Sequence, residues 1–161
     1  MLEKITKDKQ ILLERLMQVY YHDISADFPL DINNETMLYE IDDLSKYFEN
    51  KNNIGYFIKY EDKIAGFVLV DLYEDKNVID QIFVLNNYKK HSLAKLAVFK
   101  IFDMYKGYWE IKAVPCSKRA EMFWTKVISE YTDNNYEENR IGKYSRLILN
   151  FNNTVSNTCH K

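Results

Sequence analysis

The chain has 161 residues, a net charge of −2 and a composition that is 47% hydrophobic and 15% aromatic. This length suits one domain with a sizeable core, and so many core-forming residues exclude an intrinsically disordered chain. The near-neutral charge argues against a dedicated nucleic-acid binder, which would carry a strongly basic face.

Several further classes of protein are not expected. No apolar run is long enough to cross a bilayer, and Met1 leads into charged residues rather than into a signal peptide. The two cysteines, Cys116 and Cys159, and the three histidines show no metal-ligand spacing. We therefore expect a cytoplasmic protein with reduced thiols, and neither a metal site nor a membrane or nucleic-acid partner.

The first 50 residues predict helices joined by a loop. Asp8 is placed to cap a helix that ends around residues 22–24. The apolar positions of this helix are Ile11, Leu12, Leu16, Val19 and Tyr20. Residues 30–41 are interpreted as a loop, and residues 43–50 as a short helix.

From residue 54 the apolar pattern alternates, which indicates strands. Residues 54–60 and 63–72 predict a hairpin around Glu61 and Asp62, although this turn lacks glycine. Residues 77–85 predict a third strand with strictly alternating faces. One face would carry Val78, Asp80, Ile82 and Val84, and the other Ile79, Gln81, Phe83 and Leu85.

The second half of the chain alternates helices and strands. A basic turn precedes a well-buried helix, which runs from Ser92 to about Tyr105 and is ended by Gly107. A strand follows at residues 108–113 with Trp109, Ile111 and Ala113 on one face. The next helix has the clearest amphipathic pattern, formed by Ala120, Phe123, Trp124, Val127, Ile128 and Tyr131. Strands near residues 136–140 and 143–151 and a polar tail complete the chain.

This order of elements predicts one mixed α/β (α+β) domain over residues 1–151, followed by a tail at 152–161. A meander followed by a strand–helix–strand unit implies a mixed central sheet of about six to seven strands with helices on both faces.

Five segments in this order and at these distances carry a family resemblance. They are LLERLMQVYYHDIS (12–25), KIAGFVLV (63–70), IFVLNNYKKHSLAKLAVFKIFD (82–103), YWEIKAVP (108–115) and AEMFWTKVI (120–128). The chain resembles the GNAT superfamily of acyl-CoA-dependent N-acyltransferases over nearly its whole length, and above all a bacterial subgroup.

The resemblance implies an acetyl-CoA-dependent N-acetyltransferase, in which a primary amine of a small molecule or peptide attacks the thioester directly in a ternary complex. The implied partners are acetyl-CoA as cosubstrate and an amine acceptor, with a homodimer as a further possibility. Loop carboxylates would suit a cationic acceptor: Asp23, Asp27, Asp31 and Glu35. The alternative is a GNAT-like CoA-binding or interaction module that has lost turnover. The third strand should diverge from the strand at 108–113, so that its backbone groups pair with ligand.

The resemblance also places the CoA pyrophosphate in the basic turn, whose alternative interpretation is a solvated connection. The family motif falls on Lys89, Lys90, His91, Ser92, Leu93 and Ala94, and Lys95 adds charge. Ser92 stands where the family has a glycine. A positive φ there would strain serine, and a negative φ would let its hydroxyl cap the helix; we favour the cap.

Catalytic roles follow less directly. A backbone N–H within Phe83–Leu85, at Val84 or Leu85, would polarise the thioester. The subgroup often has a glutamate where this chain has Gln81, which cannot take a proton. Asp80 would need a bulge to replace it, and Asp71, Glu74 or water-mediated deprotonation are alternatives.

In many relatives a tyrosine protonates the leaving thiolate, and this tyrosine falls on Trp124, which is interpreted as a core aromatic. The asparagine that precedes the tyrosine in the family falls on Ser117. Trp124 and Ser117, together with Phe123, are expected to line the CoA site. Tyr136 and Tyr144 are the alternative acids, and Cys116 is expected to be a buried or half-exposed structural thiol.

Overall fold

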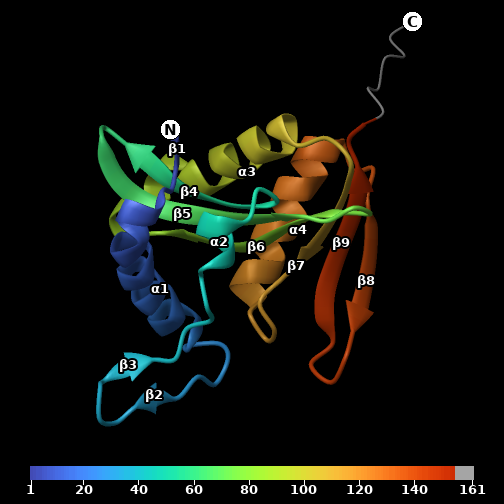
Figure 1. The fold of residues 1–161 in the computed structure, drawn as a ribbon. Coiled ribbons are helices and arrows are strands. Elements are labelled where there is room, and N and C mark those ends of the chain that lie inside the picture. Colours follow the sequence, from blue (N-terminus) through green and yellow to red (C-terminus); the bar gives the residue numbers. More distant parts are fainter. Residues whose placement is uncertain (155–161) are drawn as a thin grey trace, which may run out of the picture.

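Seven strands form a central sheet, and helices cover both of its faces (Figure 1). The computed structural model describes residues 1–154. The strands of the sheet are β1 (Leu2–Lys4), β4 (Asn53–Tyr60), β5 (Lys63–Leu72), β6 (Asn77–Val84), β7 (Tyr108–Lys112), β8 (Glu137–Ile141) and β9 (Arg146–Asn152). A separate ribbon consists of β2 (Ile32–Asn33) and β3 (Leu38–Tyr39). The helices are α1 (Gln10–Ile24), α2 (Lys46–Glu49), α3 (Leu93–Met104) and α4 (Lys118–Thr132), with 3₁₀ turns at Lys7–Lys9 and Asn86–His91.

The sheet has the order β1-β4-β5-β6-β7-β9-β8, and β6 and β7 are its parallel pair. The expected mixed α/β fold with helices on both faces is confirmed. The β4–β5 hairpin forms without glycine because Glu61 and Asp62 both adopt positive φ, 46° and 62°, as a tight two-residue turn requires. Sequence reasoning missed β1, whose three residues pair with the edge of β4, and the small ribbon in the predicted loop.

Helices α1 and α2 cover one face of the sheet. The predicted apolar stripe of α1 is largely wrong, since Ile11 and Val19 are about half exposed, at 50% and 45%. Leu13 and Met17 are fully buried instead, together with Tyr20, the one residue that belongs to both stripes. The helix carries two overlapping apolar stripes, and contact with the sheet determines which is buried. Asp8 lies in the preceding 3₁₀ turn and does not cap α1.

Helices α3 and α4 cover the other face and build the larger core. Trp109, Ile111 and Ala113 are buried together, as predicted, and the predicted face of α4 packs against them. The middle of α3 is buried, but Leu96 and Met104 at its ends are nearly half exposed. The helix ends at Met104, within one residue of its predicted end at about Tyr105.

Strand β6 determines the geometry of the site. It pairs with β5 along its length but with β7 at one position only, between Asn77 and Trp109, so the expected divergence is confirmed. The β5–β6 register shifts between the Leu69–Gln81 and Val70–Ile79 pairs and leaves Asp80 as the extra residue of a bulge. The predicted strict alternation is therefore wrong.

The bulge redistributes the side chains of β6. Ile79 packs into the core under α3 and α4, whereas Phe83, predicted on the same face, packs against α1. One extra residue reverses the faces on its two sides because side chains alternate with a period of two.

Some predictions concern segments or features outside this sheet. No helix within residues 1–154 is long and apolar enough to cross a membrane. In the same range, no three metal-ligating side chains lie close enough to hold an ion. Cys159 and most of the predicted tail lie outside the described residues. Asn153 still contacts the domain, since its side chain accepts a 2.8 Å hydrogen bond from the N–H of Gly107.

Candidate functional site

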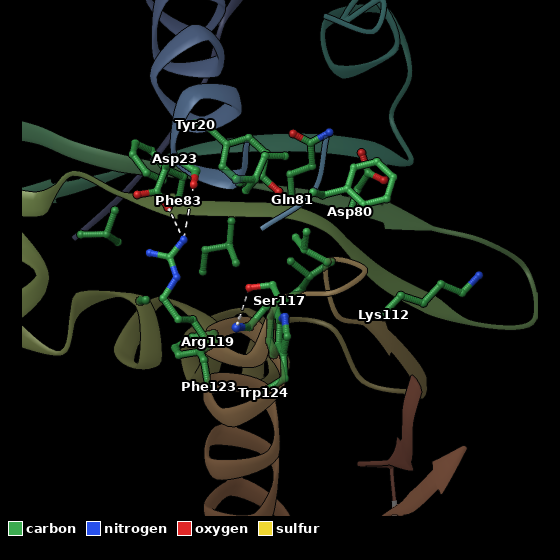
Figure 2. A pocket seen from close by; sticks show the side chains of 18 of the residues that line it. Tyr20, Asp23, Asp80, Gln81, Phe83, Lys112, Ser117, Arg119, Phe123 and Trp124 are labelled. Carbon is green, nitrogen blue, oxygen red and sulfur yellow. Dashed lines mark hydrogen bonds and ion pairs between the residues drawn. The ribbon is translucent and has the colours of Figure 1, made fainter. Parts of the chain in front are cut away.

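A cavity of about 870 Å³ opens where β6 and β7 diverge (Figure 2). Its walls come from the end of α1, the edge of β6, the first turns of α3 and α4, and the segment after β7. Figure 2 shows side chains from the α1 side, such as Tyr20, facing those from the start of α4, such as Ser117 and Phe123. The cavity therefore lies across the gap in the sheet.

The edge of β6 offers free backbone groups to this cavity. The N–H of Leu85 donates to the carbonyl of Ala65 at 2.8 Å, so it points towards β5. Hydrogen-bonding direction alternates along an antiparallel ladder, and the N–H of Val84 consequently points towards the gap. Of the two predicted donors, Leu85 is thus excluded and Val84 is retained.

Gly66 allows β5 and β6 to approach at this point. A Cβ atom on Gly66 would lie 2.0 Å from the carbonyl oxygen of Phe83, far inside van der Waals contact. A side chain there would push β6 away, so the glycine fixes the position of the strand that carries Val84.

The basic turn forms the next wall, and here the preferred prediction is wrong. Ser92 has φ 54° and ψ 24°, which is the left-handed conformation, and its hydroxyl makes no capping bond. Leu93, Ala94 and Lys95 begin α3 and line the cavity together with Ser92. Their backbone N–H groups have no partner within the helix, because the first turn of any helix leaves these donors free.

Other residues of the turn point elsewhere. The ring of His91 stacks on Tyr60 at 4.3 Å between centroids. Neither His91, Lys90 nor Leu85 is among the residues that line the cavity. Lys89 does line it, so the positive charge of the turn reaches the cavity through Lys89 and Lys95.

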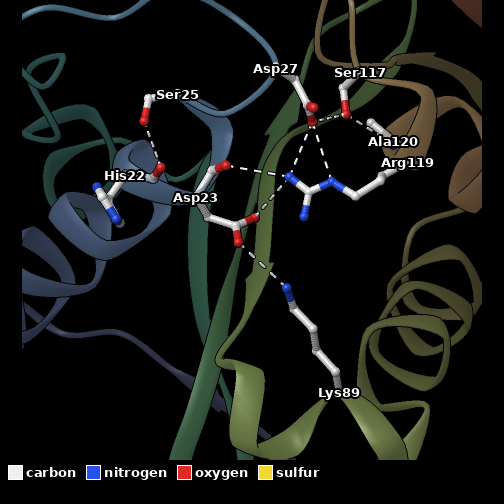
Figure 3. Close-up of polar contacts among 8 residues, drawn as sticks. All are labelled: His22, Asp23, Ser25, Asp27, Lys89, Ser117, Arg119 and Ala120. Atoms are coloured by element: carbon white, nitrogen blue, oxygen red, sulfur yellow. Dashed lines mark hydrogen bonds and ion pairs between the residues drawn. The ribbon is translucent and has the colours of Figure 1, made fainter.

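A group of ion pairs and hydrogen bonds, which we call the α1–α4 latch, joins the end of α1 to the basic turn and the start of α4 beside the cavity (Figure 3). Its members are Asp23, Asp27, Lys89, Ser117 and Arg119. Lys89 Nζ lies 3.6 Å from Asp23, and Arg119 Nη2 lies 3.1 Å from Asp27. Ser117 caps α4 by accepting from the N–H of Ala120, and its hydroxyl donates to Asp27 at 2.7 Å. That hydrogen bond, assisted by Arg119, lowers the pKa of the Asp27 carboxyl.

The latch changes the interpretation of the acidic loop. Asp23 and Asp27 are engaged with cations of this chain. Asp31 lines a separate cavity of about 330 Å³, and Glu35 is exposed beside the small ribbon. Among the four predicted loop carboxylates, only Asp23 lines the main cavity.

The bulge brings Asp80 into the cavity beside Gln81 (Figure 2). Solvent reaches the Asp80 carboxylate through the open cavity, and the hydroxyl of Tyr47 donates to it at 2.9 Å. The walls on its other sides still remove part of its hydration, and this partial desolvation raises the pKa of Asp80. Oε1 of Gln81 is buried and has no hydrogen-bond partner among the described residues.

The remaining predicted candidates lie as follows. Trp124 is 5% exposed in the core, as expected, and also lines the cavity with Phe123. Tyr136 packs at the edge of that core, and Tyr144 is 47% exposed with its ring against Phe28; neither lines the cavity.

Three further assignments change. Asp71, an alternative base in the sequence analysis, is 2% exposed and accepts hydrogen bonds from Lys46 and Asn53 at 2.8 Å each. Glu74 is exposed, and neither carboxylate lines the cavity. Cys116 is exposed, whereas a buried or half-exposed thiol was expected.

Sequence reasoning missed three residues of the cavity wall. Tyr20 was predicted as an apolar helix position, without a role for its hydroxyl; burial raises the pKa of this hydroxyl, which therefore stays protonated. Arg119 and Arg146 carried no local signal, because nothing in the pattern around them shows that they face a cavity. The bulge at Asp80 likewise has no marker such as glycine.

Charges divide between the two sides of the cavity. Six cations belong to the turn before α3, the helices α3 and α4, and the β7 and β9 strands: Lys89, Lys95, Lys112, Arg119, Lys126 and Arg146. Four carboxylates belong to α1, the loop after it, and β6: Asp23, Glu40, Asp42 and Asp80. One side therefore suits a polyanion and the other a cationic amine.

Comparisons with known proteins agree with this architecture. A model of the acetyltransferase (GNAT) family matches residues 17–127. No curated protein matches the sequence. The PaiA N-acetyltransferase of Thermoplasma acidophilum, solved in complex with coenzyme A, superposes with a TM-score of 0.66 at 10% identity, over 95% of this chain and 98% of that one.

Two further structures share the fold. A Bacillus subtilis acetyltransferase in complex with CoA gives a TM-score of 0.55 at 13% identity, covering 94% of this chain and 97% of that one. The ribosomal-protein-alanine N-acetyltransferase of Brucella melitensis gives 0.58 at 12% identity, covering 93% and 97%.

Proposed function

Because the chain belongs to the GNAT acetyltransferase family, we propose that it transfers an acetyl group from acetyl-CoA to a primary amine of a small molecule or peptide. The observation that carries this proposal is the free edge of β6, which faces a cavity of about 870 Å³ between two diverging strands. Acetyl-CoA supplies the activated thioester for the reaction.

The walls of the cavity fit a CoA molecule. The free β6 edge can pair with amide groups of an extended arm, and the N–H of Val84 can polarise a carbonyl that lies against it. The first N–H groups of α3 and the side chains of Lys89 and Lys95 favour phosphate. Two of the solved relatives are in complex with coenzyme A, which supports this assignment.

Asp80 is the base that the structure supports best. Its carboxylate lies in the cavity on the carboxylate side, and the raised pKa makes it a better proton acceptor than an ordinary aspartate. The ammonium proton passes to Asp80, the amine nitrogen bonds to the acetyl carbon, the carbon–sulfur bond breaks, and the nitrogen releases its second proton to solvent as the amide forms. Thiols have a pKa of about 8.5, so the departing thiolate takes a proton from solvent without a dedicated acid.

The test combines binding with turnover. Thermal shift should show stabilisation by acetyl-CoA and by free CoA, and thiol release over a panel of amines should exceed background. Each acetylated product is identified by mass. The alternative of a binding module, which the Ser92, Gln81 and Trp124 replacements together favour, predicts stabilisation without thiol release for every amine. Absence of binding would refute both interpretations.

The cellular compartment and dimerisation stay predictions. We infer a cytoplasmic enzyme from the supply of acetyl-CoA in that compartment, and sedimentation of the purified chain would establish whether it pairs with a second copy.

A further inference from the structure

One cation of the cavity wall differs from the others. Four of the six lie within 4 Å of a carboxylate: Lys89 with Asp23, Lys95 with Glu130, Lys112 with Glu110, and Arg119 with Asp27. Lys126 is exposed on α4. Arg146 alone is partly buried and has no carboxylate within 4 Å among residues 1–154.

The backbone holds Arg146 in place. Its Nε donates to the carbonyl oxygen of Ala113 at 2.7 Å, just beyond the end of β7. This bond fixes one edge of the guanidinium and leaves its two terminal amino groups without a hydrogen-bond partner among the described residues. Burial lowers the pKa of Arg146, because the walls remove water and the nearby charges only partly compensate for its loss.

Arg146 projects into the half of the cavity that carries the proposed base. Leu147, the next residue of β9, is buried in the core under α3 and α4, so Arg146 points to the opposite face, where α1 lies. Asp80 and Tyr20 also line this cavity, and both raise the pKa of Arg146 against the effect of burial.

Asp80 and Arg146 nevertheless form no ion pair. Each is held by a neutral neighbour, Asp80 by the hydroxyl of Tyr47 and Arg146 by the carbonyl of Ala113. Two opposite charges that share a cavity without meeting leave room for a ligand that carries both complementary charges.

We propose that the acceptor is a small zwitterionic amine, an amino carboxylate, whose carboxylate is bound by Arg146 while its ammonium faces Asp80. This inference rests on the proposed function and specifies the acceptor. The guanidinium offers two parallel donors to the carboxylate, and the protonated Tyr20 hydroxyl is a further donor in the same wall.

The experiment compares acceptors that differ only in the carboxylate. Each amino carboxylate, from α-amino acids to ω-amino acids of increasing length, is assayed beside its primary amide and its decarboxylated amine. Wild-type protein should favour the carboxylate member of the best triplet in kcat/KM by about 10- to 100-fold, the usual effect of one hydrogen-bonded charge pair. Amides or plain amines acetylated equally well would overturn the inference.

Variants then test the residue. Arg146→Gln should raise KM for the amino carboxylate about 10- to 100-fold, with little change in kcat and none in KM for the matched amide. Arg146→Lys should recover part of the loss by restoring the charge without the planar fork. Lys143→Gln removes a cation of the same hairpin that is exposed outside the cavity, and it should change none of these values.

The selectivity ratio protects the test against misfolding. A variant that folds poorly loses activity towards both members of a pair and leaves their ratio unchanged, which would count against Arg146. Thermal shift with acetyl-CoA separates the two proposals. Failure to bind acetyl-CoA refutes the proposed function, whereas binding and turnover without preference for a carboxylate refute only the zwitterionic acceptor.

Discussion

Replacing Ser92 by glycine should stabilise the protein. Ser92 adopts φ 54° and ψ 24°, a conformation that costs a residue with a Cβ roughly 1–2 kcal/mol. Glycine avoids this cost but loses about 0.5–1 kcal/mol through the greater freedom of the unfolded chain. No capping bond is lost, because the Ser92 hydroxyl makes none. The middle of these two ranges leaves a net gain of about 0.75 kcal/mol, equivalent to a rise of about 1.5–3 °C in Tm for a domain of this size.

Thermal and urea unfolding measure this gain, and CoA titration measures its effect on the cavity. Ser92 lines the cavity, so the loss of its side chain lets a phosphate approach the backbone more closely and should lower Kd for CoA about 2- to 5-fold. Ser145, with φ 49° outside the cavity, is the matched control: Ser145→Gly should raise Tm similarly and leave Kd for CoA unchanged. A Ser92→Gly variant that melts lower, or a loss of about 1 kcal/mol in Ser92→Ala, would show that Ser92 caps the helix and refute this reasoning.

Three further changes test other parts of the site. Gly66→Ala should destabilise the fold by about 3 kcal/mol in urea unfolding, because its Cβ would collide with the Phe83 carbonyl; an unchanged midpoint would contradict the close approach. Asp80→Asn should lower kcat/KM about 100-fold or more and remove the acid limb of the pH profile, which lies above the range of an ordinary aspartate. Because folding raises the pKa of Asp80, the stability that the protonated carboxyl contributes is lost as pH rises through the folded pKa. Asp80→Asn should therefore also melt higher than the wild type at pH 7, and a lower Tm would show that folding lowers this pKa instead. Replacing Lys89 and Lys90 together by Glu should weaken CoA binding and flatten its salt dependence, and wild-type affinity would place the phosphates elsewhere.

The order of elements could be predicted from the sequence because strong local patterns agree with the fold. Strand β5 matches its predicted bounds, and Trp109 and Ile111 are buried on the predicted face. A run with alternating apolar residues can bury all of them on one face only as a β-strand. The β1 strand is too short to show a period, and it exists because the edge of β4 offers it hydrogen bonds.

The details of the site could not be predicted in the same way. The bulge at Asp80 breaks the alternation without any glycine to mark it, and only the pairing with β5 reveals it. The conformation of Ser92 runs against its capping preference, because the 3₁₀ turn before it and α3 after it determine the local backbone. Arg146 and Asp80 are 66 positions apart in the sequence, and no local pattern links them.

The single bridge between β6 and β7 divides the sheet into two half-sheets that are also continuous in sequence. Strands β1, β4, β5 and β6 precede residue 85, and β7, β9 and β8 follow residue 107. Within residues 1–154, only one residue pair, Asn77 and Trp109, bridges the half-sheets, so most of the contacts that join them are the hydrophobic contacts of α3 and α4 with both. Such halves can open as separate cooperative units. A ligand that lies along β6 would act as the missing strand and couple the two half-sheets. The free energy needed to separate them would therefore increase with the concentration of the cosubstrate.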